Sequence, residues 1–577
     1  MPALTPTPTD NGIARRLGDF ANLTDALDYA AGGAGGMNFY TARGELADLI
    51  TWGQMREDAR LLGAQLLARG LETGDRVAIV AETEADFSRA LMGCLYAKLV
   101  PCPVPLPSAF GSRLAYGEQL RRIADVAQIS AAIAPRMFRD WISESLSDRS
   151  LNFVGTAGDL ENDSARGLPD GQPNANEIAY LQFSSGTTSF PKGVAVTHGA
   201  MMANIRAMAQ FGLQVREGDR GVSWLPYYHD MGLVGCVMVP IACQLSADFL
   251  TTRDFILRPG IWVELISRNR GTLSYSPSFG YDLAARRARH SDTLDLSAWR
   301  VAGIGGDIIK TTNLRNFDRV FAPHGFDARA FLPSYGMAEA ALGLSFARIG
   351  AGARTESVDI DRLRDEGIAV PPAIGARSRD FAICGRPLPD HDLEVRGEDG
   401  QCLPDGQVGQ IFTRGPSLMQ GYYGNPEETA RVLSPDGWLD TGDLGYMRDG
   451  EIVVTGRVKD LIIVNGRNIW PQDIEWSIES TVDGAKEGSV AAFQLTDEGD
   501  EAADDHRIGL VIECRRRDLA EREALRQAVQ AVVRKTVGIE ARVALSAPGA
   551  LPRTSSGKLS RSKAKDNFLA GVYEMAD

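Results

Sequence analysis

The segment LQFSSGTTSFPKG occupies residues 181–193 and carries the strongest local signal in the chain. The apolar run 178–183 predicts a strand that leads into this segment, and a helix pattern begins near Thr197. Hydroxyl side chains and free backbone N–H groups in such a loop can surround phosphate oxygens, and Lys192 adds positive charge. The glycine and lysine spacing is not that of a Walker A loop. A flexible Ser/Gly linker is the alternative interpretation.

Strand and helix patterns alternate around this loop through the first two-thirds of the chain. Residues 61–67 have the apolar spacing of a helix, and 76–80 form a short apolar run typical of a buried strand. A second helix pattern covers 84–97, and the apolar segment 100–105 follows it. This repetition predicts parallel βαβ units.

The pattern changes in the last third of the chain. Between about 381 and 455, short alternating segments are separated by Gly, Pro and Asp, which predicts a small antiparallel sheet or barrel. Beyond Gly456 we expect strands at 488–495 and 508–513 and a helix from about 519 to 537. This last unit is long enough to fold separately.

Composition limits the classes of function. The 577 residues include 44% hydrophobic and 24% charged residues, as in ordinary globular proteins. The net charge of −14 disfavours nucleic-acid binding, which needs clustered cations. Seven cysteines without a CxxC motif are typical of reduced thiols, and no apolar run approaches the length of a membrane helix. We therefore expect a cytoplasmic protein with no integral membrane segment and no nucleic-acid partner.

Four further segments contain residues suited to nucleotide chemistry. PSYGMAE at 333–339 has an aromatic ring and a carboxylate, and WLDTGDLG at 438–445 has an acid in a glycine-flanked turn. GRVKD at 456–460 lies where the composition changes, and LPRTSSGKL occupies 551–559. Each segment alone is typical of an ordinary turn or linker.

Together and in this order, the five segments resemble the motifs of the adenylate-forming superfamily of acyl-CoA synthetases, peptide-synthetase adenylation domains and luciferases. The resemblance extends from about Leu23 to Lys565. Within the superfamily the chain is most similar to the fatty acyl-AMP ligases, as three segments indicate: GMNFY at 36–40, PCPVPLP at 101–107 and WLPYYHDMGL at 224–233.

The spacing between two of these segments supports the same family. The gap from Glu339 to Gly385 looks about 20 residues longer than in typical acyl-CoA synthetases. Acyl-AMP ligases carry an insertion there that hinders the use of free coenzyme A, and in this chain it would cover roughly 352–379. A tolerated surface loop is the alternative interpretation.

The resemblance implies an α/β fold with two domains. A large N-terminal adenylation domain, 1–458, would contain two βαβ subdomains and a small β-barrel, and a separate, smaller, mobile α+β C-terminal domain would cover 459–577. The family reaction first joins a fatty acid to AMP with release of pyrophosphate. The acyl group then passes to the phosphopantetheine thiol of an acyl carrier protein, or of a carrier domain in a polyketide or peptide synthase. The implied cofactors are ATP and Mg²⁺.

The resemblance also assigns roles to individual residues. Lys558 is the main catalytic candidate, with Thr187 and His229 beside it, although Lys558 could be a solvated tail lysine and His229 a core histidine. Glu339 and Thr187 would bind the metal, and Lys459 and Asp460 would form the hinge. The expected nucleotide-binding residues are Ser184, Ser185, Gly186, Thr187, Thr188, Lys192, Gly305, Gly306, Asp307, Ser334, Tyr335, Gly336, Met337, Ala338, Asp443 and Arg457.

Two other functions remain open at this point. A long- or medium-chain acyl-CoA synthetase shares the ATP motifs and differs in its acceptor. A nucleotide-binding pseudoenzyme that acts as a sensor or scaffold would be expected to lack Glu339 or Lys558, and both are present. The chain contains neither the GxSxG motif of serine hydrolases nor the HExxH motif of zinc hydrolases. Apolar residues that could line an acyl tunnel or belong to the ordinary core are Met201, Met202, Met208, Phe211, Tyr275, Phe279 and Tyr281.

Overall fold

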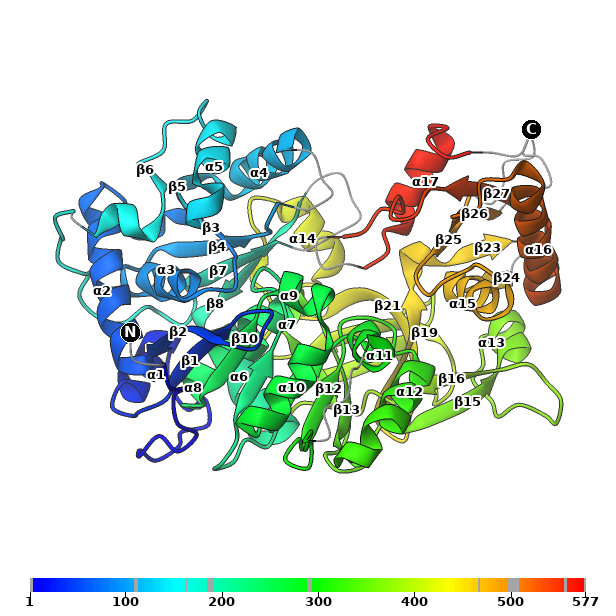
Figure 1. Cartoon of the computed structure of the whole chain (residues 1–577), viewed down its shortest axis with the longest axis horizontal. Coiled ribbons are helices and arrows are strands. Elements are labelled where there is room, and N and C mark those ends of the chain that lie inside the picture. The colour runs from blue at the N-terminus through cyan, green and yellow to red at the C-terminus, as the bar shows by residue number, and fades with distance from the viewer. Residues whose placement is uncertain are drawn as a thin grey trace.

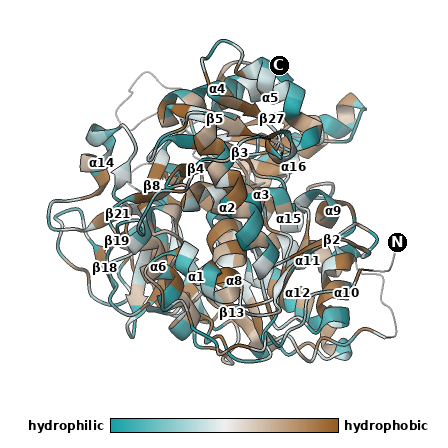
Figure 2. Cartoon of the chain, turned by 90° about the vertical axis from the view of Figure 1, so that its left-hand side faces the viewer, coloured by the Kyte–Doolittle hydropathy of each residue, from teal (hydrophilic) through white to brown (hydrophobic). Residues whose placement is uncertain are grey.

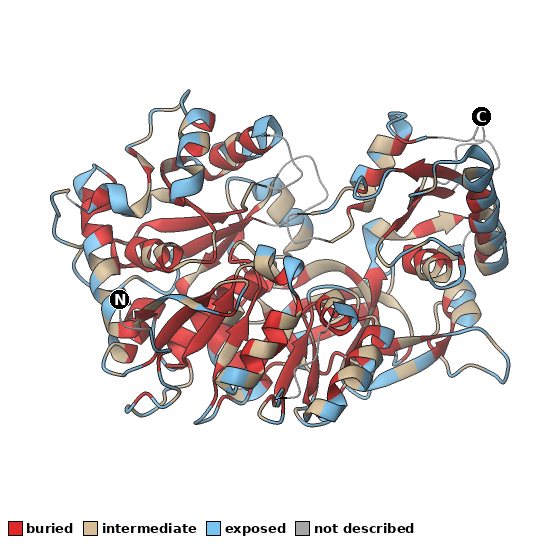
Figure 3. Cartoon of the chain, in the orientation of Figure 1, coloured by how far each residue is buried: buried red, intermediate tan, exposed pale blue. Residues whose placement is uncertain are grey.

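The computed structural model has a large N-terminal body and a smaller C-terminal lobe (Figure 1). The residues that it describes are 4–107, 113–161, 163–183, 191–287, 293–464, 467–495, 508–554 and 558–574. Buried residues fill the sheets of both parts, while the outer faces of the helices are exposed (Figure 3).

A four-stranded parallel sheet forms the first subdomain. Its order is β4-β3-β5-β6, with helices α2 and α3 in contact beside it. These outer helices carry hydrophobic and hydrophilic residues together (Figure 2). The predicted strands and helices of this region, and the parallel βαβ arrangement, are confirmed. The elements are α2 (Trp52–Ala68), β3 (Arg76–Val80), α3 (Ala85–Tyr96), β4 (Val100–Val104), α4 (Arg113–Ala127), β5 (Ile129–Ile133) and β6 (Phe153–Gly155).

A nine-stranded sheet forms the second subdomain. Its order is β17-β14-β13-β12-β11-β9-β10-β1-β2, and the ladders between β1 and β13 are parallel. Helices α10 (Gly260–Asn269), α11 (Ser278–Arg287) and α12 (Thr311–Phe321) follow strands of this sheet. The strands are β1 (Gly36–Tyr40), β2 (Leu46–Thr51), β9 (Gly221–Ser223), β10 (Ala247–Leu250), β11 (Leu273–Ser276), β12 (Val301–Ile304), β13 (Phe331–Gly336), β14 (Gly343–Phe346) and β17 (Arg386–Pro387).

The strands on either side of residues 184–190 belong to a separate three-stranded sheet. The predicted strand is β7 (Ile178–Phe183), and the predicted helix is α6 (His198–Ala207), which Thr197 caps through its side chain. Between them lies a strand that we did not predict from the sequence, β8 (Gly193–Thr197). It pairs antiparallel with β7 and with β20 (Gly421–Tyr422).

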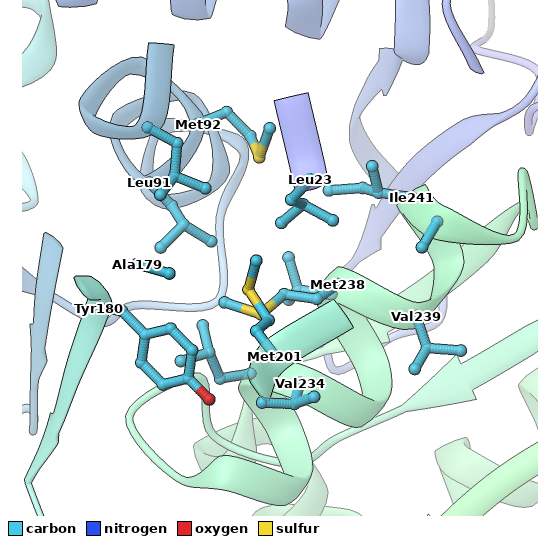
Figure 4. Packing of buried hydrophobic residues seen from close by; sticks show 14 of the residues in the cluster. Leu23, Leu91, Met92, Ala179, Tyr180, Met201, Val234, Met238, Val239 and Ile241 are labelled. Atoms are coloured by element: carbon cyan, nitrogen blue, oxygen red, sulfur yellow. The ribbon is translucent and has the colours of Figure 1, made fainter. Parts of the chain in front are cut away.

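A large hydrophobic cluster packs where these elements meet. Figure 4 shows Tyr180 of β7 and Met201 of α6 among Leu91, Met238 and neighbouring apolar side chains of this cluster. Leu91 and Met238 are fully buried, and so is Met201. Met201 therefore belongs to the core and does not line an acyl tunnel.

The alternating segments of the last third form a four-stranded antiparallel sheet. Its order is β18-β19-β21-β22, which leaves β18 and β22 at its two edges, so these described strands form an open sheet. The strands are β18 (Asp392–Arg396), β19 (Gly409–Arg414), β21 (Leu439–Arg448) and β22 (Glu451–Arg457).

The expected insertion is a folded unit. It consists of the antiparallel pair β15 (Thr355–Asp359) and β16 (Ser378–Ala382), with α13 (Ile360–Glu366) in the connection. Apolar side chains of this unit, including Phe381, share a buried cluster with Trp470 of the C-terminal lobe. In Figure 1 the unit lies directly below that lobe, so it is more than a peripheral surface loop.

The C-terminal lobe has its own sheet and core. Strands β25, β26 and β27 form a three-stranded sheet whose apolar residues pack against α15 and α16. The predicted strands near 490 and 510 and the helix from 519 are confirmed. The elements are β23 (Ile462–Val464), β24 (Arg467–Ile469), α15 (Pro471–Thr481), β25 (Val490–Gln494), β26 (Ile508–Glu513), α16 (Leu519–Val537), β27 (Ala541–Ser546) and α17 (Arg561–Leu569).

Candidate active site

A cavity of about 560 Å³ lies where the nine-stranded sheet, the β7-β8-β20 sheet, the four-stranded antiparallel sheet and the C-terminal lobe meet. All of the predicted site residues that the structure describes line this cavity. The predicted residues Ser184, Ser185, Gly186, Thr187 and Thr188 lie outside the described residues.

An aromatic ring, a carboxylate and a guanidinium form a chain on one wall. The Tyr335 hydroxyl, near the end of β13, donates a 2.8 Å hydrogen bond to Oδ2 of Asp443. Asp443 on β21 faces Arg457 on β22 in the strand register, and Arg457 Nε lies 3.2 Å from Asp443 Oδ1. Burial raises the pKa of Asp443, whereas Arg457 and the Tyr335 hydroxyl act in the opposite direction. The wall thus presents an oriented acceptor beside an aromatic face.

A glycine turn brings the backbone close to the Lys558 amine. Gly306 has φ of +78°, a conformation that glycine adopts without a steric penalty. A Cβ atom on Gly306 would lie 4.0 Å from Lys558 Nζ, and one on Gly305 would lie 3.0 Å from the Ser334 hydroxyl. The turn therefore leaves space that a larger residue would fill.

Opposite charges surround the Lys558 amine. Burial and the nearby Arg457 lower the pKa of Lys558, while Asp307, Asp230 and Asp443 act to raise it. Burial acts to raise the pKa of Asp230, but His229 and Lys558 hold it below the ordinary value. The Nδ1 atom of His229 lies 2.5 Å from Asp230 Oδ1.

The predicted metal ligand, Glu339, lines the cavity and contacts Tyr422 of β20. The Tyr422 hydroxyl donates a 2.9 Å hydrogen bond to Glu339 Oε1. Burial raises the pKa of Glu339, and this hydrogen bond acts to lower it. Lys192, which we predicted near phosphate groups, forms an ion pair with Glu428 and lies 4.9 Å from the Tyr422 ring centroid.

The predicted hinge residues Lys459 and Asp460 lie at the mouth of the cavity between the two domains. Arg561 donates to Asp460 Oδ2 at 2.9 Å and to both carboxylate oxygens of Glu475 at 2.8 and 2.7 Å. These bonds connect the start of α17 with Asp460 and with α15.

The other end of the cavity is apolar. Met208 and Tyr275, two of the seven apolar candidates, line it together with Cys236 and Phe346. The remaining candidates lie elsewhere: Met201, Met202 and Tyr281 are buried in the core, Phe279 packs against Trp224, and Phe211 is exposed.

Several residues at the site were not predicted from the sequence. Tyr422, Asp230 and Arg561 line the cavity and touch predicted residues. Asp230 could have been found, because it follows His229 directly. Tyr422 and Arg561 carried no separate signal, since their partners are distant in sequence.

Comparison with known proteins now defines the class. Residues 40–423 match the model of the AMP-binding enzymes, so the chain belongs to that family. In the described part of the chain, no helix combines the length and the apolar composition needed to cross a membrane.

Three relatives and one solved structure narrow the assignment. A Caulobacter vibrioides protein named putative acyl-CoA synthetase is 49% identical, with 99% of each chain covered. The long-chain-fatty-acid–AMP ligase FadD32 of Mycolicibacterium smegmatis is 32% identical, covering 93% of this chain and 91% of that one. The medium-chain-fatty-acid–[acyl-carrier-protein] ligase JamA of Moorena producens is 30% identical, with 96% of each covered.

The solved chain comes from structural and functional studies of fatty acyl-adenylate ligases from E. coli and L. pneumophila. It is 41% identical with a TM-score of 0.92, and the match covers 97% of this chain and 100% of that chain. Within the AMP-binding enzymes, the chain therefore belongs with the fatty acyl-AMP ligases.

Proposed function

We propose that this protein activates a fatty acid with ATP to form acyl-AMP and pyrophosphate, and then transfers the acyl group to the phosphopantetheine thiol of a carrier protein. The observation that carries the proposal is the position of the Lys558 amine, inside a cavity that has the Asp443–Arg457 pair on one wall and an apolar end. A carrier-protein acceptor is supported by the similarity to JamA.

The first step needs positive charge because a carboxylate must approach an α-phosphate, and both are anions. The Lys558 ammonium would offset the negative charge that gathers as the new bond to phosphorus forms. The nearby Asp230 and Asp307 favour its protonated form, against the effect of burial. His229, ordered by its contact with Asp230, would border the substrate carboxylate.

Nucleotide recognition would fall to the wall formed by Tyr335 and Asp443. Asp443 would accept hydrogen bonds from the ribose hydroxyls, with Arg457 beside it, and the Tyr335 ring would stack on adenine. The glycine turn at 305–307 would border the adenine. Each role matches the donor or acceptor chemistry of the side chain.

The residues also fit Mg²⁺ bound together with ATP. Glu339 supplies a carboxylate that lines the cavity, the ligand type that Mg²⁺ prefers, and Mg²⁺ would offset phosphate charge there. Among the residues that the structure describes, no cluster of three or more His, Cys, Asp or Glu could hold a metal. This is in keeping with an ion that takes its other ligands from phosphates and water.

An acyl-CoA synthetase is the second candidate, since the C. vibrioides relative bears that name. A pyrophosphate-release assay across fatty acids of different length, with mass analysis of the bound adenylate, tests the first step. Offering coenzyme A and a phosphopantetheinylated carrier protein in parallel tests the acceptor. Carrier loading without acyl-CoA supports the proposal; acyl-CoA as the main product favours the second candidate. The absence of fatty-acid-dependent pyrophosphate release would overturn both.

A further inference from the structure

Glu487 belongs to the C-terminal lobe, but its side-chain partners lie on the N-terminal domain. It occupies the loop between α15 and β25. Asn313 of α12 donates to Glu487 Oε1 at 2.8 Å, and Lys310 Nζ lies 3.5 Å from the same oxygen. Arg286 of α11 pairs with Glu487 Oε2 and is itself held by Asp282, 2.7 Å from its Nε atom. Side chains from two helices of the N-terminal domain therefore bind this carboxylate. We call the contacts of Glu487 with Arg286, Lys310 and Asn313 the grip.

Helix α15 adds contacts on the same side. Lys310 Nζ lies 3.3 Å from Glu479 Oε2 and 5.4 Å from the centroid of the Trp476 ring. The guanidinium of Arg379, on β16, lies 4.6 Å from that ring. Trp476 therefore contacts two cations of the N-terminal domain, an arrangement that favours one orientation of α15.

Hydrogen bonds connect the Glu487 loop to the segment that carries Lys558. The carbonyl of Gly488 accepts from Arg553 Nη2 at 2.7 Å. Next along the chain, the Thr554 N–H donates to the Lys558 carbonyl at 2.8 Å, and the Lys558 N–H donates to the Thr554 hydroxyl at 3.2 Å. A physical path of backbone and side-chain contacts therefore runs from α11 and α12 through Glu487 to Lys558.

We propose that Glu487, held by Arg286, Lys310 and Asn313, is a positioning residue that fixes the C-terminal lobe with the Lys558 amine in the cavity, and so favours adenylate formation over acyl transfer. This inference rests on the proposed function. The grip spans two domains and is only partly exposed, with exposed side-chain fractions of 22% for Glu487 and 19% for Lys310. Ion pairs in such a setting are screened less than those on an open surface.

Weakening the grip should change how often the C-terminal lobe adopts each of its arrangements, without changing the reacting groups in the site. A contact made in only one arrangement stabilises that arrangement alone, so its loss shifts the equilibrium away from it. Lobe arrangements that do not use this grip gain population. Adenylate formation should therefore slow, while transfer from preformed acyl-AMP should be unchanged or faster.

The test uses the full-length chain with Glu487→Gln, which removes the charge and keeps the size. We expect the kcat of fatty-acid-dependent pyrophosphate release to fall about tenfold, with KM for ATP changed less than about threefold. Carrier loading from added acyl-AMP should stay within about twofold of the original protein or exceed it. Lys310→Met combined with Glu487→Gln should cost less than the sum of the two single changes, because both single changes remove the Lys310–Glu487 contact. Lys310→Met alone should lower kcat at least as much as Glu487→Gln, because it also removes the contacts of Lys310 with Glu479 and Trp476.

Glu540→Gln removes a carboxylate that pairs with Arg534 within the C-terminal lobe and is the matched control, with both half-reactions expected near normal. Equal loss of both half-reactions, or no change in either, would overturn the inference. Hydrogen exchange provides a readout independent of activity. Glu487→Gln should speed exchange at the C-terminus of α11, which carries Arg286, and at the N-terminus of α12, which carries Asn313. Unchanged exchange at both places would contradict the grip. If the original protein releases no pyrophosphate with any fatty acid, the proposed function fails. The exchange measurement then still shows whether Glu487 holds α11 and α12.

Discussion

At the scale of single residues, Tyr422 gives the carboxylate of Glu339 a fixed orientation. The two residues are 83 positions apart, yet the Tyr422 hydroxyl donates to Glu339 Oε1 at 2.9 Å. Groups that orient a metal ligand commonly affect metal affinity as well as activity. Tyr422 therefore provides a test of whether Glu339 binds Mg²⁺.

Tyr422→Phe removes this hydrogen bond and keeps the ring that packs near Lys192. We expect the Mg²⁺ concentration for half-maximal pyrophosphate release to rise about tenfold, with a smaller change at saturating Mg²⁺. Tyr423→Phe, at the adjacent position, is the control. An unchanged Mg²⁺ dependence in Tyr422→Phe would count against Glu339 as the metal ligand.

The site residues that we predicted lie in motifs that occur in a recognisable order along the chain. The residues that we missed join the site only through contacts between distant parts of the sequence. Tyr335, Asp443, Arg457 and Lys558 belonged to segments with recognisable residue types, and the structure brings them to one cavity. Glu487 had no such signal, because its partners are more than 170 positions away. Lys192 lines the same cavity, but its ion pair with Glu428 could not be predicted from the local sequence.

At the scale of elements, the start of α3 concentrates acidic groups. Glu84 precedes the helix, and burial raises its pKa from 4.5 to about 7, with further increases from Asp86, Glu82 and Asp48. Between pH 4.5 and about 7, the folded protein keeps a proton that the unfolded chain releases. Stability is therefore lost as the pH rises through this window, and the loss is constant above it.

Glu84→Gln removes this titration. We expect equal stability of the variant and the original protein at pH 4.5 and below, and an advantage for the variant that grows to about 3 kcal/mol near pH 7. Thermal unfolding midpoints measured across this pH range check the prediction. Glu118→Gln, on the exposed side of α4, is the control. A constant difference between Glu84→Gln and the original protein at all pH values would contradict the assignment.

Element prediction succeeded where local patterns agreed with the final packing. The helix 519–537 and the strand 76–80 have clear periodicity or apolar runs, and both occur as expected. Strand β8 was missed because GVAVT is short and is defined by pairing with β7 and with the distant β20. For the insertion, only its presence could be predicted, from the spacing between two motifs. Its strands could not, because the hairpin is stabilised by contacts with Trp470 of the C-terminal lobe.

At the scale of the whole molecule, the insertion connects the two domains. Arg379 of β16 lies 2.7 Å from Asp473 of α15, and both side chains are buried. Arg467 of the C-terminal lobe approaches Asp365, next to α13's last residue, at 3.6 Å. The insertion therefore contacts both α15 and β24 of the C-terminal lobe, and we propose that these contacts affect which thiol reaches the adenylate.

The double variant Arg379→Met and Asp473→Asn removes this contact without leaving one buried charge unpaired. We expect acyl-CoA formation from free coenzyme A to rise several-fold, with adenylate formation within about threefold of the original protein. Arg315→Met with Asp380→Asn, which removes a more exposed ion pair between α12 and β16, is the control. An unaltered ratio of acyl-CoA to carrier product would contradict a role of this contact in acceptor choice.

The central claim is that the Lys558 amine supports adenylate formation inside the interdomain cavity, and the most direct measurement is acyl-AMP formation by Lys558→Ala. Lys563→Ala, at an exposed position of α17, is the matched control and should remain near normal. We expect Lys558→Ala to lose acyl-AMP formation by at least about 100-fold while ATP binding stays measurable. Near-normal acyl-AMP formation by Lys558→Ala would contradict the claim.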